Sequence, residues 1–217
     1  KPLVLLERLI LAATRAGDPD RIDPGDGFLM RHGFSVAWCG WQWDVVRSEA
    51  LMGLEAPPAM EGGKPIGGQT IVQFQPNELH WTHLLADRVH RPYPAADIDN
   101  SSATLTEQDY LYGPATNIPR DRWQFAYEDG GRLVPDDSHI YLADGFLPGK
   151  VYTLVYNTGK APVAGVGLLA VRDCVSFLRH SVASQGNPLA GSADWAYGFG
   201  VSQSGRFLRH FLYLGLN

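Results

Sequence analysis

The sequence lacks several features that would narrow its class. Only two of its 217 residues are cysteines, Cys39 and Cys174, and they lie far apart in apolar segments. This pattern predicts two buried structural thiols rather than a disulfide framework, and it indicates no compartment. No apolar run is long enough to cross a bilayer, so the sequence predicts no membrane span.

The chain also carries only a small excess of charge of one sign. The chain has 18 Lys and Arg against 23 Asp and Glu, a formal net charge of -5. This gives no electrostatic basis for binding nucleic acid or an anionic membrane surface. With 45% hydrophobic residues the chain can bury a core without disulfides. The sequence leaves the oligomeric state open, as well as the choice between a cytoplasmic location and export after removal of a leader.

The most informative stretch is 195–215, which predicts a short buried strand, a tight turn and a helix. Ser202 stands at the turn, with Gly200 two residues before it and Ser204 two after it. This spacing is typical of a nucleophile elbow. The flanking residues must be small because the serine takes a strained backbone conformation that pushes its hydroxyl away from the neighbouring strand and helix.

Residues beside this turn have predicted roles too. The backbone N–H of Gln203 lies at the helix N-terminus, where it would donate to an oxyanion. Ser204 is the weaker nucleophile candidate because its own +2 residue is the bulky Arg206. For Arg206 the sequence leaves two roles open: binding an anionic substrate in the pocket, or an ion pair with Asp44 or Asp173.

A second candidate region is the aromatic loop at the end of segment 34–44, which we expect to begin with a buried strand. Gly40, Trp41 and Gln42 would then lie at the carboxyl end of that strand, where ligand groups collect in open α/β sheets. We expect Gln42 to line the substrate pocket beside Trp41. The backbone of this loop, at Trp41, would supply a second oxyanion donor.

The pattern along the chain predicts an α/β fold: a mostly parallel sheet flanked by helices, with an inserted β-rich subdomain. We assign 1–54 to the first part of the α/β core and 145–217 to its continuation up to the elbow and its helix. Between them, short β runs separated by Gly and Pro turns predict an insert or lid at 55–144. Segment 3–16 fits a strand or a short helix equally well, and 18–27 is a turn-rich connector.

The final segment carries the clearest periodicity. A strand is expected at 151–156, and apolar residues at spacings of three and four predict a helix over 168–179 that packs on a sheet. The order strand, helix, strand, elbow, helix matches a partial α/β-hydrolase core.

Histidines and acidic residues in the insert do not predict a metal site. His80, His83 and His90 lack the carboxylate or thiolate partners of a zinc site, so packing explains them better. The segment 97–102 lacks the spaced acidic ligands of a calcium loop, which leaves a solvated loop. The sequence therefore predicts no metal and no cofactor.

Four segments also carry a resemblance to a known family: 33–42, 145–156, 162–179 and 200–209. They resemble the bacterial alpha/beta hydrolase domain-containing family of serine hydrolase-like proteins. They are similar more distantly to glucuronoyl esterases, which place a basic residue after the nucleophile in a Ser-x-x-Gly-Lys/Arg pattern. The resemblance runs from about 25 to 217 and implies a serine hydrolase with Ser202 as nucleophile and no particular substrate. It also implies that the chain is an N-terminal portion of a longer protein.

The residues after Ser202 lead to the same expectation. They include no Asp or Glu, and the only histidine is His210. A hydrolase of this chain order needs its acid and base after the serine, whereas His210 lies about 12 Å along the helix at 1.5 Å per residue. The sequence thus predicts a carboxylic ester hydrolase with a small-molecule substrate, whose acid and base lie beyond Asn217. The chain alone should show little hydrolysis.

Two other functions stay open at this stage. One is a non-catalytic α/β binding module or pseudoenzyme, in which the Trp41 loop and the β-rich insert hold a carbohydrate or an aromatic ligand. The other is a serine-dependent acyl transferase, which shares the elbow and differs in whether an alcohol or water accepts the acyl group.

Overall fold

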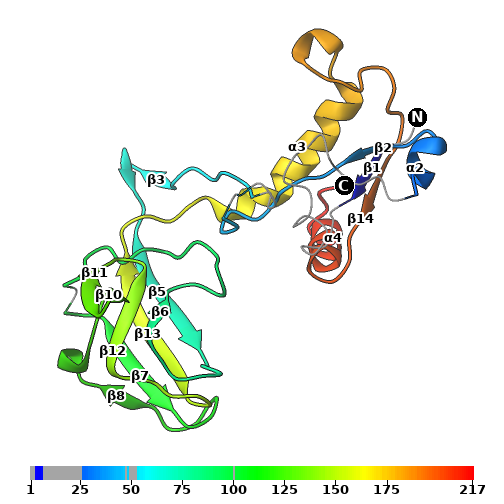
Figure 1. The fold of residues 1–217 in the computed structure, drawn as a ribbon. Helices are drawn as coiled ribbons and strands as arrows, with labels where there is room; N and C mark the ends of the chain where they lie inside the picture. Colours follow the sequence, from blue (N-terminus) through cyan, green and yellow to red (C-terminus); the bar gives the residue numbers. More distant parts are fainter. Residues whose placement is uncertain (1–2, 7–25, 47, 49–52, 100) are drawn as a thin grey trace. The chain divides into compact units, whose positions relative to one another are not determined.

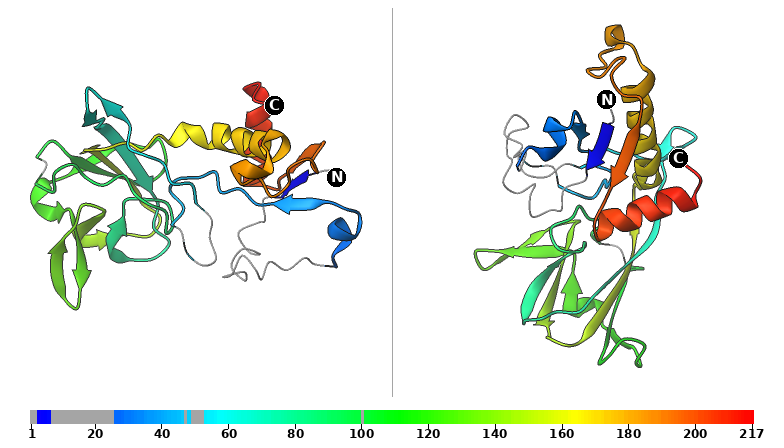
Figure 2. Two further views of the ribbon diagram at one scale, coloured as in Figure 1. Left: turned by 90° about the horizontal axis from the view of Figure 1, so that it is seen from above. Right: turned by 90° about the vertical axis from the view of Figure 1, so that its right-hand side faces the viewer.

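The computed structural model describes residues 3–6, 26–46, 48, 53–99 and 101–217. The chain divides into two compact units, one formed by 1–56 with 164–217 and the other by 57–163. The first unit holds the parallel strands and the two long helices of the described residues (Figure 1). The second unit is built from antiparallel strands (Figure 2).

The first unit contains a three-stranded parallel sheet. Its strands are β1 (Leu3–Leu6), β2 (Ser35–Ala37) and β14 (Ala196–Phe199), in the order β14-β1-β2. In the central strand Leu3 is paired with Ala196 on one side and with Ser35 on the other. Because the strands are parallel, the loop after β2 and the turn after β14 leave the sheet at the same edge.

The described residues of this unit form three helices: α2 (Phe28–Arg31), α3 (Gly167–His180) and α4 (Gln203–Tyr213). The helix predicted over 168–179 is confirmed as α3. Its Leu178 packs with Ala193, and partly buried Ala37 and Ala196 complete this small core. The apolar face of α3 therefore covers β2 and β14. The 3-10 turns η3 (Ala164–Val166) and η4 (Ala183–Gln185) lie before and after α3.

The described residues of the second unit form strands of two to eight residues and one 3-10 turn, η2 (Arg120–Arg122). The strands are β3 (Met60–Glu61), β4 (Lys64–Pro65), β5 (Gly68–Phe74), β6 (His80–Leu84), β7 (Thr104–Gln108), β8 (Thr116–Ile118), β9 (Trp123–Gln124), β10 (Ala126–Asp129), β11 (Arg132–Pro135), β12 (His139–Phe146) and β13 (Val151–Thr158). They form the sheets β5-β13-β7-β8 and β6-β12-β9 and the hairpins β10-β11 and β3-β4, and every pairing is antiparallel.

Buried apolar side chains alternate with more exposed ones along these strands and form one hydrophobic core. Leu105 of β7, Ile140 of β12 and Leu154 of β13 are fully buried, as are the rings of Phe146 and Tyr152. Side chains on one face of each strand point to the same side, so the two larger sheets bury one set of residues between them.

The two ends of the second unit are fastened to each other. The N–H of Val163 donates to the carbonyl of Pro57 at 2.9 Å, and the N–H of Ala59 donates to the carbonyl of Ala161 at 2.7 Å. The chain therefore enters and leaves this unit at neighbouring points, which is the arrangement expected of an insert.

The predicted fold class is wrong. Strands make up 33% of the chain and helices 20%, and most of the sheets are small and antiparallel, so this is not a mostly parallel α/β-hydrolase core. The strand expected at 151–156 to rejoin a parallel sheet is β13, which lies antiparallel between β5 and β7. Buried central strands have the same continuous apolar pattern in both kinds of sheet, so the sequence did not reveal the direction of pairing.

The unit boundaries also differ from the sequence assignment, since the divisions fall at 56/57 and 163/164 rather than at 54/55 and 144/145. Of segment 3–16, Leu3–Leu6 is a strand, and 7–16 lies outside the described residues, as does most of the connector 18–27. Within the described residues, every helix is too short or too polar to cross a membrane.

Candidate active site

The turn between β14 and α4 holds Ser202 in a strained conformation. Its φ is 58° and its ψ is -113°, immediately before the first residue of α4. Among the described residues only Arg88 and Tyr112 are further non-glycine residues with positive φ. Such a conformation costs about 1–3 kcal/mol and occurs most often at functional sites. The Ser202 side chain is exposed.

Gly200 makes this turn sterically possible. A Cβ atom at Gly200 would lie 2.6 Å from the carbonyl carbon of Ser204 and 2.9 Å from the backbone nitrogen of Gly205. The chain leaving β14 therefore crosses directly over the first turn of α4. Only glycine fits at this crossing, which gives the small flanking residue of the sequence pattern its physical reason.

Ser204 closes the turn with its side chain. Its hydroxyl accepts a hydrogen bond from the N–H of Val201 at 2.8 Å and donates to the carbonyl of Val201 at 2.9 Å. Its side chain is buried. The sequence ranked Ser204 below Ser202 because of the bulky residue that follows it, but it did not reveal this role. The Ser204 hydroxyl holds the loop, while Ser202 is left exposed to solvent.

The start of α4 offers donors to an anion beside Ser202. The N–H of Arg206 binds the carbonyl of Ser202 at 3.0 Å, which fixes the first helical turn. The N–H of Gln203 belongs to the first turn, where backbone donors have no acceptor within the helix. The helix dipole adds partial positive charge there. Negative charge developing next to Ser202 would be stabilised by both effects.

The loop after β2 lies against this turn, as the shared sheet edge predicted. Gln203 donates from Nε2 to Oε1 of Gln42 at 3.2 Å. The ring of Trp41 packs on Phe207 of α4 with centroids 4.6 Å apart. A Cβ at Gly167, the first residue of α3, would lie 2.0 Å from the carbonyl oxygen of Trp41. The loop is thus held between α3 and α4, and the Trp41 ring contributes packing there.

Arg206 is exposed and lies one turn into α4. Among the described residues it makes no ion pair, and Asp173 is bound by Arg172 at 2.7 Å instead. The structural role that the sequence offered for Arg206 as a partner of Asp173 is therefore not found. Its guanidinium is available to an anionic group of a ligand.

Within the described part of the chain, no histidine forms a hydrogen bond to Ser202. His210 stacks on Tyr213 with ring centroids 6.1 Å apart, further along α4. His180 is the last residue of α3, and His32 packs on Phe28 at 4.4 Å. None of these three histidines of the first unit is therefore hydrogen-bonded to Ser202.

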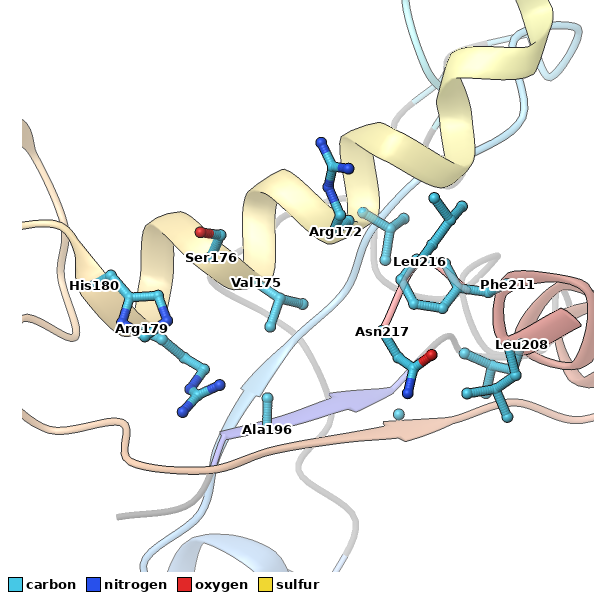
Figure 3. A pocket seen from close by; sticks show the side chains of 13 residues that line it. Arg172, Val175, Ser176, Arg179, His180, Ala196, Leu208, Phe211, Leu216 and Asn217 are labelled. Atoms are coloured by element: carbon cyan, nitrogen blue, oxygen red, sulfur yellow. The ribbon is translucent and has the colours of Figure 1, made fainter. Parts of the chain in front are cut away.

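An apolar pocket of about 540 Å³ lies in the first unit between α3, α4 and β14. Figure 3 shows Val175 of α3 and Phe211 and Leu208 of α4 around it, with Ala196 of β14 below. Neither Ser202 nor the loop after β2 lines this pocket. The pocket is therefore separate from the serine turn.

A second pocket, of about 610 Å³, lies in the β-rich unit beside Arg120. The guanidinium carbon of Arg120 lies 4.1 Å from the centroid of the Trp123 ring, and its Nη2 donates to the carbonyl of Ile98 at 3.2 Å. This arginine holds two loops of its own unit together. Its position gives no indication of a ligand.

The histidines of the β-rich unit form a packed pair. Nε2 of His80 and Nδ1 of His83 are 3.2 Å apart, and the His83 ring stacks on Phe74 at 3.5 Å. Burial, together with the charges of His80 and His139, lowers the pKa of His83 to about 4. His83 is therefore a neutral packing residue at physiological pH.

A scan of protein-family models, a search of curated proteins and a search of solved structures gave no match to this chain.

Proposed function

We propose that this chain carries the nucleophile of a serine hydrolase that cleaves carboxylic esters, and that Ser202 is that nucleophile. One observation supports the proposal most strongly: an exposed serine with φ of 58° sits between a strand and the N-terminus of a helix. A serine seldom takes this strained conformation without a functional reason. In a nucleophile elbow it aims the hydroxyl at the substrate and places backbone donors beside it.

The proposed reaction begins when Oγ of Ser202 attacks the ester carbonyl. The hydroxyl proton passes to a base, and the N–H of Gln203 donates to the oxyanion that forms. The loop that carries Trp41 supplies the second donor, and the Gln42–Gln203 hydrogen bond holds that loop against the turn. Collapse of the intermediate expels the alcohol with a proton and leaves an acyl group on Ser202, which water then removes as the acid.

In the described residues no histidine is hydrogen-bonded to Ser202, so the proposal includes no base or carboxylate partner from this chain. Catalysis by binding and by the oxyanion donors survives loss of the triad, but it is slow. Arg206 lies one turn along α4 and would favour substrates with an anionic group near the ester.

The test uses an activated ester and an external base. The chain is incubated with p-nitrophenyl acetate with and without added imidazole, and intact mass measures the acetylated fraction. We expect one acetyl group per chain, formed faster with imidazole because imidazole takes the proton that no described histidine accepts. The variant Ser202→Ala should form none on this turn. Ser176→Ala, which removes an exposed serine of α3, should match the wild type.

One result of this experiment would contradict the proposed role of Ser202. If the folded wild-type chain and Ser202→Ala acquire the same acetyl groups at the same rate with imidazole present, Ser202 is not an activated nucleophile. The turn would then serve binding or folding alone.

A further inference from the structure

The two cysteines of the chain face each other across the first unit. Sγ of Cys39 and Sγ of Cys174 are 3.8 Å apart, although the residues are separated by 135 positions in the sequence. Cys39 follows β2 by two residues, and Cys174 lies in the middle of α3. A disulfide needs its sulfur atoms about 2.05 Å apart. Moving from the observed 3.8 Å contact to a bond therefore requires the two sulfur atoms to approach each other by about 1.8 Å.

Packing around the two cysteines keeps their sulfur atoms close together. Cys174 packs against the small core formed by Leu178 and Ala193. At the start of the same helix, Gly167 lies against the carbonyl of Trp41, two residues after Cys39. The helix and the loop are thus in contact at two points. Both cysteines are partly exposed, so a small reagent can reach them.

The contact also activates one thiol. The Cys39 thiol donates a hydrogen bond to Sγ of Cys174. This bond lowers the pKa of Cys174 to about 7, against the opposing effect of burial. A large fraction of Cys174 is therefore thiolate at neutral pH, and the thiolate is the form that attacks disulfides.

We propose that Cys39 and Cys174 form a reversible disulfide by exchange with a low-molecular-weight disulfide such as oxidised glutathione. The Cys174 thiolate attacks one glutathione sulfur, forms a mixed disulfide and expels the other glutathione as thiolate. Cys39 then loses its proton and attacks Sγ of Cys174, which expels the second glutathione. Two protein thiols are oxidised, one glutathione disulfide is reduced to two thiols, and reduced glutathione reverses the step.

The bond would join the loop after β2 to α3 and close a chain loop that contains the whole β-rich unit. Closing so long a loop restricts the unfolded chain and stabilises the folded one. The oxidised protein should therefore unfold at a temperature several degrees higher than the reduced protein, a shift of the size expected for a domain of this length. This inference does not depend on the chemistry of Ser202.

The test equilibrates the wild-type chain with defined ratios of reduced and oxidised glutathione at neutral pH, followed by acid quenching, alkylation and peptide mapping. We expect a peptide pair joined through Cys39 and Cys174, two protected thiols per chain, and full reversal on adding reduced glutathione. The variants Cys39→Ser and Cys174→Ser are matched controls. Each should gain at most one glutathione and form no disulfide within the chain.

Several results would overturn the proposal. One is that both thiols of the folded wild-type chain stay open to alkylation under oxidising ratios. Another is that the only products are mixed disulfides or cross-links between two chains. A third is that oxidised and reduced wild-type protein unfold at the same temperature although the internal bond is present, which would remove its proposed stabilising effect.

Discussion

At the scale of single residues, Ser202 has a backbone conformation that glycine adopts far more easily. Replacing it with glycine should relieve strain, whereas Ser202→Ala keeps a Cβ atom and the strain with it. We predict that Ser202→Gly is more stable than Ser202→Ala by about 1 kcal/mol, after the greater flexibility of glycine in the unfolded chain is allowed for. Urea unfolding of the two variants measures this difference directly.

Both variants lose the hydroxyl, so neither should be acylated at the turn. A glycine variant that is more stable than the alanine variant, while both are unreactive, is the result expected of a strained functional residue. Equal stability of the two variants, or a more stable alanine variant, would show that the turn stores no strain at this position.

His83 gives the second prediction at this scale. Its pKa is lowered to about 4 in the folded chain by burial, and the unfolded value is about 6.5. The unfolded state therefore takes up the proton first as the pH falls. The contribution of neutral His83 to stability is complete above pH 6.5 and is lost progressively as the pH drops toward 4.

The size of this loss is about 2 kcal/mol, reduced from the full linkage value because the ring is partly exposed. Denaturant unfolding of the β-rich unit at pH 7 and at pH 4.5, in wild type and in His83→Gln, measures it. The variant should show a flatter pH dependence. Parallel curves for the two proteins would mean that His83 does not titrate differently in the folded state.

Single residues also show what the sequence could and could not predict about the site. The position of Ser202 at a turn followed by a helix came from local spacing, and the structure places a strained serine there. The bonds of Ser204 to Val201 were not predicted, because the partner of a hydroxyl depends on how the turn closes. The Cys39–Cys174 contact was missed because no local pattern links positions 135 residues apart.

At the scale of elements, the contact between α3 and the loop after β2 determines whether that loop keeps its place. A Cβ at Gly167 would lie 2.0 Å from the carbonyl oxygen of Trp41, whereas a Cβ at Gly165 would meet nothing within 4 Å. We predict that Gly167→Ala lowers the free energy of unfolding by about 1–3 kcal/mol, the range of an overpacked site. Gly165→Ala should change it by less than about 0.5 kcal/mol.

Chemical denaturation of the two alanine variants measures the comparison. Gly167→Ala should also slow acylation of Ser202, because the displaced loop carries Gln42, the partner of Gln203. Two variants of equal stability would contradict the close packing of α3 on Trp41.

Elements differed in how well the sequence predicted them. The 3.6-residue period located α3 to within one residue at each end, because one face of that helix is buried on a sheet. Strand β13 was also located, but its direction was wrong. The short apolar run of β13 fits a central strand in either kind of sheet, so the sequence does not tell whether its neighbours are parallel or antiparallel.

At the scale of the whole molecule, the sequence assigned the β-rich insert to 55–144, whereas the second compact unit spans 57–163. Strand β13 belongs to the insert, because it is the central strand that joins β5 to β7 and supplies Leu154 and Tyr156 to the core. The hydrogen bond from the N–H of Val163 to the carbonyl of Pro57 joins the two ends of the second unit. These contacts are long-range, so composition along the chain could not locate the second boundary.

The β-rich unit also explains why the fold class was wrong while the turn at Ser202 was found. The parallel sheet has three strands, and the antiparallel strands of the second unit outnumber them. A motif of about ten residues depends on local backbone geometry, whereas fold class depends on the pairing of every strand. The elbow pattern was therefore a sound guide to one turn and a poor guide to the whole chain.

The most direct test of the central claim is to locate the adduct left by a fluorophosphonate on the 217-residue chain, by peptide sequencing in the mass spectrometer. With imidazole present as the external base, the account predicts a single adduct on Ser202, absent from Ser202→Ala and retained in Ser176→Ala. Adducts scattered over several serines of the folded wild-type chain, or none on Ser202 when imidazole is present, would contradict it.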